Sequence, residues 1–304
     1  MAGWSTKAIR TVLLVGQYRE RNRSVERQVA LLHRRAVRPA SFRPPRSLVR
    51  RFQVSAEHVD GQLVYRIRAR SSDEYQPPAR RLVFLHGGGF VREIGREHWQ
   101  LVSRLARRLD VEVVVPIYPL APLGSAAENL PRMVLLYQRE AATGTPLDVM
   151  GDSAGGGMAL ALLLEVASAG LPLAGRTVLL SPWVDLTVND PWVREAAHLD
   201  VMLSPAMLEA ASQLWAADLP TDDPRVSPLM GDLSTLRGTR LMLLSGTHDI
   251  LNAEARRLRD LATAAGIEVT YLEEEEQPHV YAALPTPEGR AAAEEIAAFL
   301  AARL

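Results

Sequence analysis

The chain has 304 residues, of which 47% are hydrophobic and 23% charged, so it is long enough and apolar enough to bury a substantial core. Its 35 basic residues balance 35 acidic ones, which argues against a nucleic-acid partner because nucleic-acid-binding proteins usually carry a basic excess. The absence of cysteine excludes disulfides, thiolate metal sites and a cysteine nucleophile, and it fits a reducing, cytoplasmic location.

The N-terminal segment differs in charge from the rest of the chain. Residues 1–50 hold 12 basic and 2 acidic residues, whereas the remainder holds 23 basic and 33 acidic ones. Residues 1–36 have a helical pattern and prolines follow it, so residues 1–47 are predicted to form a helical cap segment. This basic segment is suited to peripheral contact with an anionic membrane, the alternative being a solvated helical face. No run approaches the roughly 20 apolar residues of an integral membrane segment.

From residue 48 onward, short β-rich runs alternate with longer helical runs. The predicted strands are Phe52–Val59, Leu63–Ile67, Arg81–Leu85, Glu112–Ile117, Leu147–Met150, Thr177–Leu180, Arg240–Leu244 and Glu268–Leu272. The predicted helices are Glu97–Leu109, Ala126–Glu140, Ala154–Ala167, Pro205–Ala217, Ala253–Ala265 and Pro287–Ala302. This alternation predicts an α/β fold with a mostly parallel sheet over residues 48–304.

The first motif along the chain is His86-Gly-Gly-Gly-Phe90, directly after a predicted strand. Glycines at a strand end leave backbone N–H groups that can point into a cavity without side chains in the way, as an oxyanion hole requires. Gly88 and Gly89 are therefore candidate donors, together with the N–H of Ala154. A phosphate-binding loop is the alternative, but the stretch lacks both the Lys-Ser/Thr pair and the G-x-G-x-x-G spacing. His86 is expected to be structural.

The second motif is Gly151-Asp-Ser-Ala-Gly155, between a predicted buried strand and an almost wholly apolar helix. A serine on such a strand-to-helix turn is exposed at the tip of a strained elbow, and glycines on both sides allow the turn to close. Ser153 is therefore the candidate nucleophile. The alternative is a glycine-rich turn with a capping serine.

Residues 182–233 interrupt the alternation and contain one amphipathic helix. We expect part of this stretch, about residues 186–222, to be a cap insertion over the carboxyl-terminal edge of the sheet, where open α/β sheets bind their ligands. Trp183, Met207 and Trp215 are candidate substrate-binding residues, the alternative being that they belong to the ordinary core.

A serine needs a base to become nucleophilic, and an acid that orients the base. Asp249 follows a predicted strand immediately, and His279 follows the next one before the last helix. The order Ser153, Asp249, His279 is that of a nucleophile–acid–base triad in which the base lies on a late loop. His248 is a rival base. No metal-ligand spacing is present, so no metal is expected.

As a set, the motifs resemble those of the hormone-sensitive-lipase-like, or bacterial family IV, carboxylesterases. They are His86-Gly-Gly-Gly-Phe90, Tyr118-Pro-Leu-Ala-Pro122, Gly151-Asp-Ser-Ala-Gly-Gly156, Leu180-Ser-Pro-Trp-Val-Asp-Leu-Thr187, Asp223-Pro-Arg-Val-Ser-Pro-Leu229, Asp249-Ile-Leu251 and His279-Val-Tyr281. The resemblance implies an α/β-hydrolase fold with eight strands, flanking helices and a helical cap. It also implies hydrolysis of short- to medium-chain carboxylic esters without a cofactor, by Ser153, Asp249 and His279 with an oxyanion hole at Gly88, Gly89 and Ala154. Relatives often form homodimers, so a homodimer is a further expectation.

The chain departs from the family at one string. Pro119 and Leu123 replace the usual Arg and Glu, and Asn129 stands where an Asp often follows, so the loop is expected to be held differently here. Two other functions stay open at this point: amide or peptide hydrolysis by the same triad, and a non-catalytic small-molecule receptor.

Overall fold

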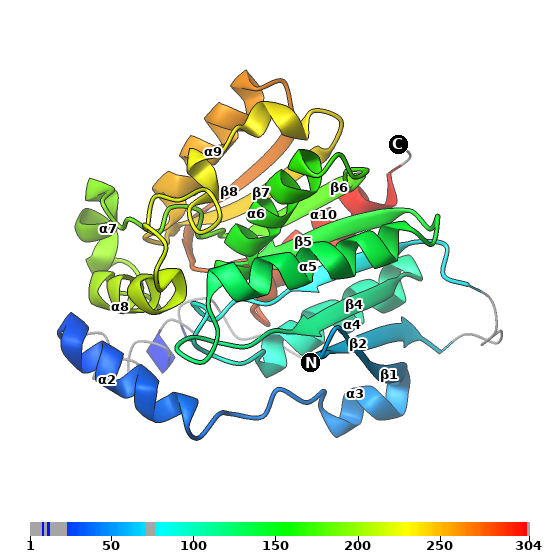
Figure 1. The fold of residues 1–304 in the computed structure, drawn as a ribbon, viewed down its shortest axis with the longest axis horizontal. Helices are drawn as coiled ribbons and strands as arrows, with labels where there is room; N and C mark the ends of the chain where they lie inside the picture. The colour runs from blue at the N-terminus through cyan, green and yellow to red at the C-terminus, as the bar shows by residue number, and fades with distance from the viewer. Residues whose placement is uncertain (1–7, 9–10, 13–22, 71–76, 303–304) are drawn as a thin grey trace.

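The computed structural model describes residues 8, 11–12, 23–70 and 77–302. Its centre is a twisted eight-stranded sheet in the order β1-β2-β4-β3-β5-β6-β7-β8 (Figure 1). The strands are β1 Phe52–Val59, β2 Gln62–Ala69, β3 Arg81–Leu85, β4 Glu112–Ile117, β5 Leu147–Asp152, β6 Arg176–Leu180, β7 Arg240–His248 and β8 Glu268–Pro278. The strands from β4 across to β8 are parallel, and only β2 runs against them, because it pairs antiparallel with both β1 and β4. This arrangement confirms the predicted α/β-hydrolase architecture.

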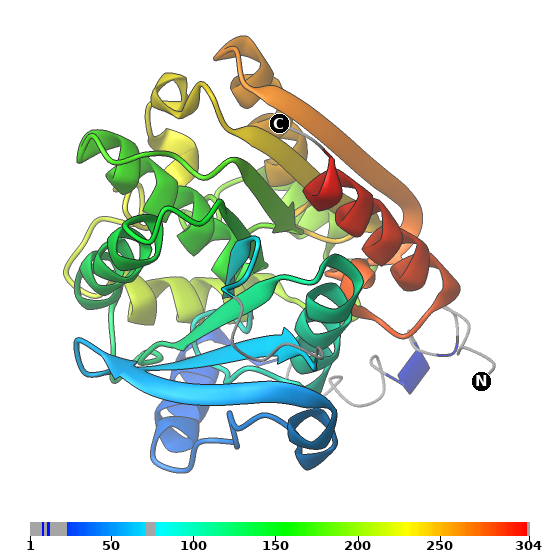
Figure 2. The ribbon, with the colours of Figure 1, turned by 90° about the vertical axis from the view of Figure 1, so that its right-hand side faces the viewer.

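Helices cover both faces of the sheet. Figure 2 shows α4 and α10 on one face and α5, α6 and α9 on the other. The helices are α2 Val25–Ala36, α3 Arg46–Arg51, α4 Arg96–Leu109, α5 Ala126–Ala141, α6 Ala154–Ser168, α7 Pro191–Glu195, α8 Pro205–Ala216, α9 Asn252–Ala264 and α10 Pro287–Ala301. Covering both faces explains why the central strands are continuously apolar, since neither side of them meets water.

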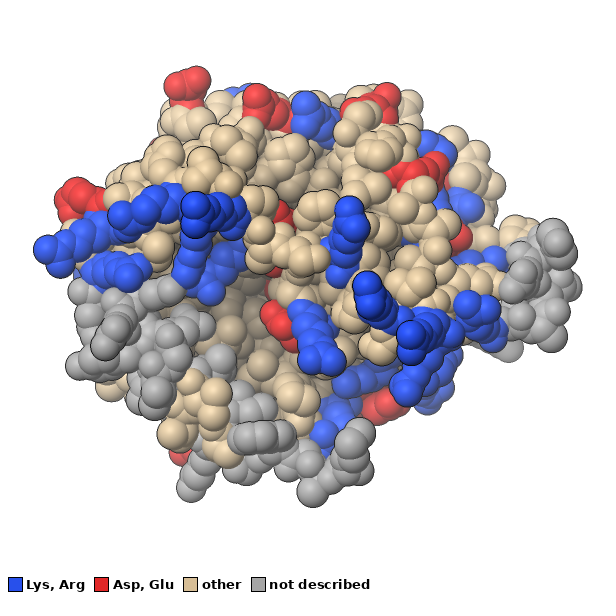
Figure 3. All heavy atoms as spheres, turned by 90° about the horizontal axis from the view of Figure 1, so that it is seen from below, with Lys and Arg blue, Asp and Glu red and all other residues tan. Residues whose placement is uncertain are grey.

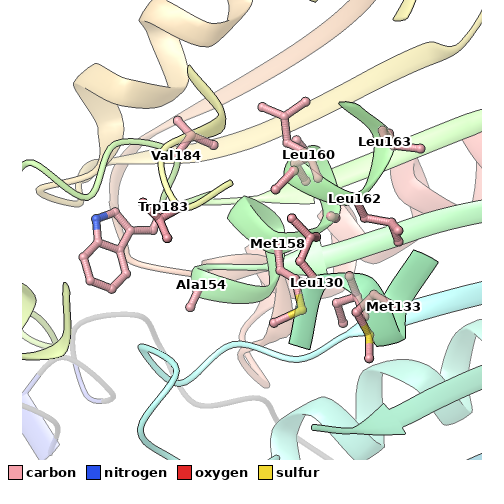
Figure 4. Packing of buried hydrophobic residues seen from close by; sticks show 14 of the residues in the cluster. Leu130, Met133, Ala154, Met158, Leu160, Leu162, Leu163, Trp183 and Val184 are labelled. Carbon is pink, nitrogen blue, oxygen red and sulfur yellow. The ribbon is translucent and has the colours of Figure 1, made fainter. Parts of the chain in front are cut away.

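Helix α6 is buried nearly all round and forms the centre of one hydrophobic core. Figure 4 shows Met158 of α6 beside Leu130 of α5, while Trp183 lies beyond the N-terminal end of α6. Burial on every side accounts for a sequence without polar residues from Ala154 to Leu164, because no face of the helix needs to be hydrated. The packing fixes the start of α6, and with it the residue that precedes the helix.

The main differences from the predicted elements concern β7, β8, α3 and α7. Strands β7 and β8 extend to His248 and Pro278, beyond the predicted ends, because they keep pairing across a register shift between Gly246 and His248. The short helices α3 and α7 were not predicted. Each begins at a proline or directly after one, but they have 6 and 5 residues and carry too little periodic pattern to be recognised.

Helices α2 and α8 pack against each other at one end of the sheet, and we call α2, α7 and α8 the cap (Figure 1). Of the predicted helical segment 1–36, residues 25–36 form α2, and most of the remainder lies outside the described residues. Among the described helices, none has both the length and the apolarity needed to cross a bilayer.

Candidate active site

Three side chains predicted to act together meet at the carboxyl-terminal edge of the sheet. The Oγ of Ser153 lies 2.8 Å from Nε2 of His279, and Nδ1 of His279 lies 2.9 Å from Oδ2 of Asp249. Each residue is at most 6% exposed. Since the carboxylate accepts at Nδ1, the Nδ1 position carries the proton and Nε2 is left to accept from the serine hydroxyl. His248, the rival base, lies at the end of β7 opposite Pro278.

Ser153 occupies a strained elbow between β5 and α6. Its φ of 52° is unusual for a residue with a side chain, and its N–H donates to the carbonyl of Leu180 at 2.8 Å. A Cβ at Gly155 would lie 2.1 Å from the carbonyl oxygen of Leu85, and one at Gly151 would lie 2.2 Å from that of Gly155. The two glycines of the motif are therefore required by close backbone approach on either side of the serine.

The surroundings of His279 favour its protonated form. Burial by itself lowers the pKa of His279, but the charge and hydrogen bond of Asp249 outweigh burial and raise this pKa above its usual value. The next residue, Val280, has a φ of 54° and donates its N–H to Oγ of Ser181 at 3.0 Å. This bond ties the loop that carries His279 to the end of β6, beside the elbow.

The glycine loop after β3 lies beside Ser153. Gly88 and Gly89 have φ angles of 116° and 62°, and both line the cavity that contains Ser153 and His279. A Cβ at Gly88 would lie 2.6 Å from the carbonyl oxygen of Arg92, so this position tolerates no side chain. Ala154 is the first residue of α6, where the helix dipole and unpaired N–H groups favour negative charge.

The string that departs from the family supports this loop by its own contacts. Tyr118 stacks on His86 with ring centroids 4.4 Å apart, and its hydroxyl donates to the carbonyl of His86 at 2.5 Å. Asn129 donates through Nδ2 to the carbonyl of Pro119 at 3.1 Å, a bond that an ionised aspartate does not make. Burial lowers the pKa of His86 to about 4, so His86 is a neutral structural residue at ordinary pH.

Two buried residues that sequence reasoning missed link the elbow to the glycine loop. Asp152 accepts hydrogen bonds from the N–H of Gly87 at 2.9 Å and from Nε2 of His98 at 3.1 Å. Nδ1 of His98 in turn accepts from the N–H of Gly95 at 2.8 Å. Asp152 lies inside the serine motif, so its position was a usable signal, whereas nothing near His98 in the sequence indicates its partner.

A third missed residue joins the cap to the triad. Asp200 is fully buried and its carboxylate accepts from the N–H groups of Met202 and Leu203, and from that of Ile250 at 3.1 Å. Burial and the neighbouring Asp249 raise the pKa of Asp200 to about 6. One side chain thus connects the loop before α8 with the residue that follows Asp249.

The cavity at Ser153 has a volume of about 470 Å³. Trp183 and Met207 line it, as do Met202, Leu203 and Leu208. Trp215 does not belong to the described lining: it is stacked flat on Phe90, with ring centroids 4.1 Å apart. Its place is therefore in the core that supports the loop, and a direct substrate contact is not supported for Trp215.

Comparison with known proteins agrees with this geometry. The family described as having an alpha/beta hydrolase fold matches residues 82–283. The chain is 32% identical over 239 residues to an acetyl-hydrolase of Streptomyces hygroscopicus, covering 75% of this chain and 78% of that protein. It is 33% identical over 201 residues to an esterase of Acinetobacter venetianus, covering 64% of this chain and 66% of that protein.

Among solved structures, an esterase from the bacterial hormone-sensitive lipase family superimposes with a TM-score of 0.76 at 26% identity, covering 91% of this chain and 97% of that one. The chain therefore belongs to the α/β-hydrolase family and, within it, to the hormone-sensitive-lipase-like esterases.

Proposed function

We propose that this protein hydrolyses short- to medium-chain carboxylic esters through an acyl-enzyme intermediate. The observation that carries the proposal is the contact of 2.8 Å between Oγ of Ser153 and Nε2 of His279, backed by Asp249. The relatives named above are an acetyl-hydrolase and esterases, which supports a small acyl group and an ester bond. A receptor without catalysis is not favoured, because Nε2 of His279 already lies within hydrogen-bond distance of Oγ of Ser153.

In the first half-reaction, Oγ of Ser153 attacks the ester carbonyl while Nε2 of His279 takes the hydroxyl proton. The carbonyl π electrons move to oxygen, and the N–H groups of Gly88, Gly89 and Ala154 stabilise the resulting oxyanion. The bond to the alcohol oxygen then breaks, and the alcohol leaves with the proton from His279. Asp249 stabilises the transient imidazolium.

In the second half-reaction, a water molecule attacks the acyl-enzyme and gives one proton to His279. The carboxylic acid product is released as Oγ of Ser153 takes that proton back. We assign substrate selection to the cap segments, residues 1–47 and about 186–222, and catalysis to the remainder of residues 48–304. Trp183 and Met207 are the proposed substrate contacts, because both line the cavity.

The test is covalent labelling by a fluorophosphonate followed by peptide mass spectrometry, together with hydrolysis of p-nitrophenyl esters. We expect the label on Ser153 and a fall in turnover of about 10⁴–10⁶-fold in the Ser153→Ala variant. Turnover retained by that variant excludes Ser153 as the nucleophile. A matched anilide decides between an esterase and an amidase. A homodimer, a cytoplasmic location and peripheral membrane contact stay predictions.

A further inference from the structure

A second cavity, of about 730 Å³, lies on the other side of the glycine loop from the catalytic cavity. It is enclosed by the C-terminal end of α2 and the linker after it, by the turn between β1 and β2, and by the string that follows β4. Val91, Arg92 and Glu93 line both cavities, so this short stretch is the wall between them. The proposed reaction makes no use of this second space.

The charged lining of the second cavity is mostly basic. Its arginines are Arg35, Arg38, Arg92 and Arg132, against a single carboxylate, that of Glu93. Within the described ranges, Arg38 and Arg132 form no ion pair with a protein carboxylate. Figure 3 shows the surrounding face from below, where basic side chains dominate, acidic ones are few and the surface is hollowed near its middle. This charge distribution attracts an anion.

One buried polar atom in the cavity wall lacks a partner. Gln62 is 4% exposed and lines the cavity, and its Nε2 donates to no acceptor in the described part of the chain. A buried amide donor without an acceptor destabilises the folded state, so such atoms normally face a ligand or water. An oxygen acceptor on a bound ligand satisfies both Gln62 and the arginines.

The rest of the lining is apolar. Phe42, Leu63, Ile117 and Leu120 line the cavity, and the side chain of Leu123 at its edge is 73% exposed. Leu123 is one of the three positions where the chain departs from its family by losing a charged residue. An apolar wall beside Arg38 and Arg132 fits a ligand with an alkyl chain and an anionic oxygen head, because the chain packs on the apolar side chains and the head binds the guanidinium groups.

We propose that this second cavity is a binding site for an amphipathic anion, an alkyl chain that ends in a carboxylate or phosphate. Arg38, Arg132 and Gln62 bind the head, and the apolar wall holds the chain. The site is separate from the catalytic cavity and does not depend on the proposed function: none of these three residues lines the space around Ser153.

The experiment is calorimetric titration of the full-length protein with monomeric dodecanoate, with neutral dodecanol and acetate as comparison ligands. We expect binding of dodecanoate, weaker binding of dodecanol and none of acetate. The double variant Arg38→Gln/Arg132→Gln is expected to bind dodecanoate about 10-fold or more weakly and dodecanol almost unchanged, because only the charge-assisted contacts are lost. Arg34→Gln is the control for loss of a nearby basic charge, since it removes one positive charge from α2 outside the cavity lining.

A second experiment distinguishes an anionic membrane lipid from a free fatty carboxylate as the ligand. Flotation with phosphatidylcholine vesicles containing phosphatidylglycerol reports binding to an anionic lipid, and dodecanoate binding without flotation identifies a free carboxylate. The melting temperature of each variant verifies folding. The proposal is overturned if the parent protein binds neither probe, or if the double variant binds dodecanoate as tightly as Arg34→Gln does.

Discussion

The carboxyl-terminal edge of the sheet and the cap hold their side chains by different means. At the edge, Ser153, Asp249 and His279 are buried and joined by short hydrogen bonds, on loops anchored to parallel strands. In the cap, α2 buries only Gln28 and Leu32 and exposes Arg27 and Arg34. The residues of the proposed chemistry are therefore held by buried hydrogen bonds at the sheet edge, whereas α2 is held by a smaller buried surface. Substitutions in the two regions are expected to have different consequences.

The largest loss is expected from Asp249→Asn at the sheet edge. An amide that donates toward Nδ1 of His279 favours the wrong tautomer, so we expect kcat to fall by about 10⁴-fold while the fold is retained. The pH profile gives a second measurement. In the parent protein the neutral base is lost as pH falls through the raised pKa of His279, so the acid limb of kcat/KM lies above about 6.5. In the variant this limb is expected to move to lower pH, and an unmoved limb contradicts the role of Asp249.

The next largest loss is expected from Asp152→Asn. The amide places a donor where the carboxylate accepted from Gly87 or His98, and His98 cannot switch tautomer without opposing the N–H of Gly95. We expect kcat to fall by about 10²-fold through a misplaced oxyanion loop. The matched control is Asp148→Asn, a buried carboxylate at the opposite end of β5 that binds Arg80 and the N–H of Arg176. That control is expected to lower the melting temperature with little change in kcat. Equal losses of kcat in both variants refute the proposed role of Asp152 in positioning the oxyanion loop.

A smaller effect is expected from Asp200→Asn, which breaks the connection between cap and edge. The carboxylate accepts three backbone hydrogen bonds that an amide cannot all replace, so we expect about 1–3 kcal/mol of lost stability and about a 10-fold lower kcat/KM. Thermal melts and ester hydrolysis measure the two effects. Unchanged kinetics alongside lost stability limits Asp200 to a structural role.

The smallest effect is expected from Met207→Ala in the cap. Removing this side chain enlarges the cavity, so the ratio of kcat/KM for octanoate over acetate esters is expected to rise by about 3–10-fold. Leu214→Ala is the control, because Leu214 lies on the same helix but outside the lining. An equal change of this ratio in both variants means that the acyl group does not bind against Met207.

The sequence by itself determined the fold class and singled out Ser153, Asp249 and His279 as candidate catalytic residues. Strand-helix alternation and continuously apolar strands are local patterns that can be read from the sequence. The elbow and the glycine loop are recognisable in the same way, because close backbone approach admits only glycine at these positions. Asp249 and His279 were predicted because loops at the carboxyl ends of adjacent parallel strands meet at one edge.

The tertiary structure alone decided the contacts between distant segments. His98 meets Asp152 across 54 positions and Asp200 meets Ile250 across 50, and no local pattern records such pairs. The extension of β7 and β8 depends on a register shift between two strands, and Trp215 lies against Phe90 because α8 is placed by its packing on α2. Pairing and packing between segments far apart in the chain are properties of the folded molecule, so they appear only when those segments are brought together.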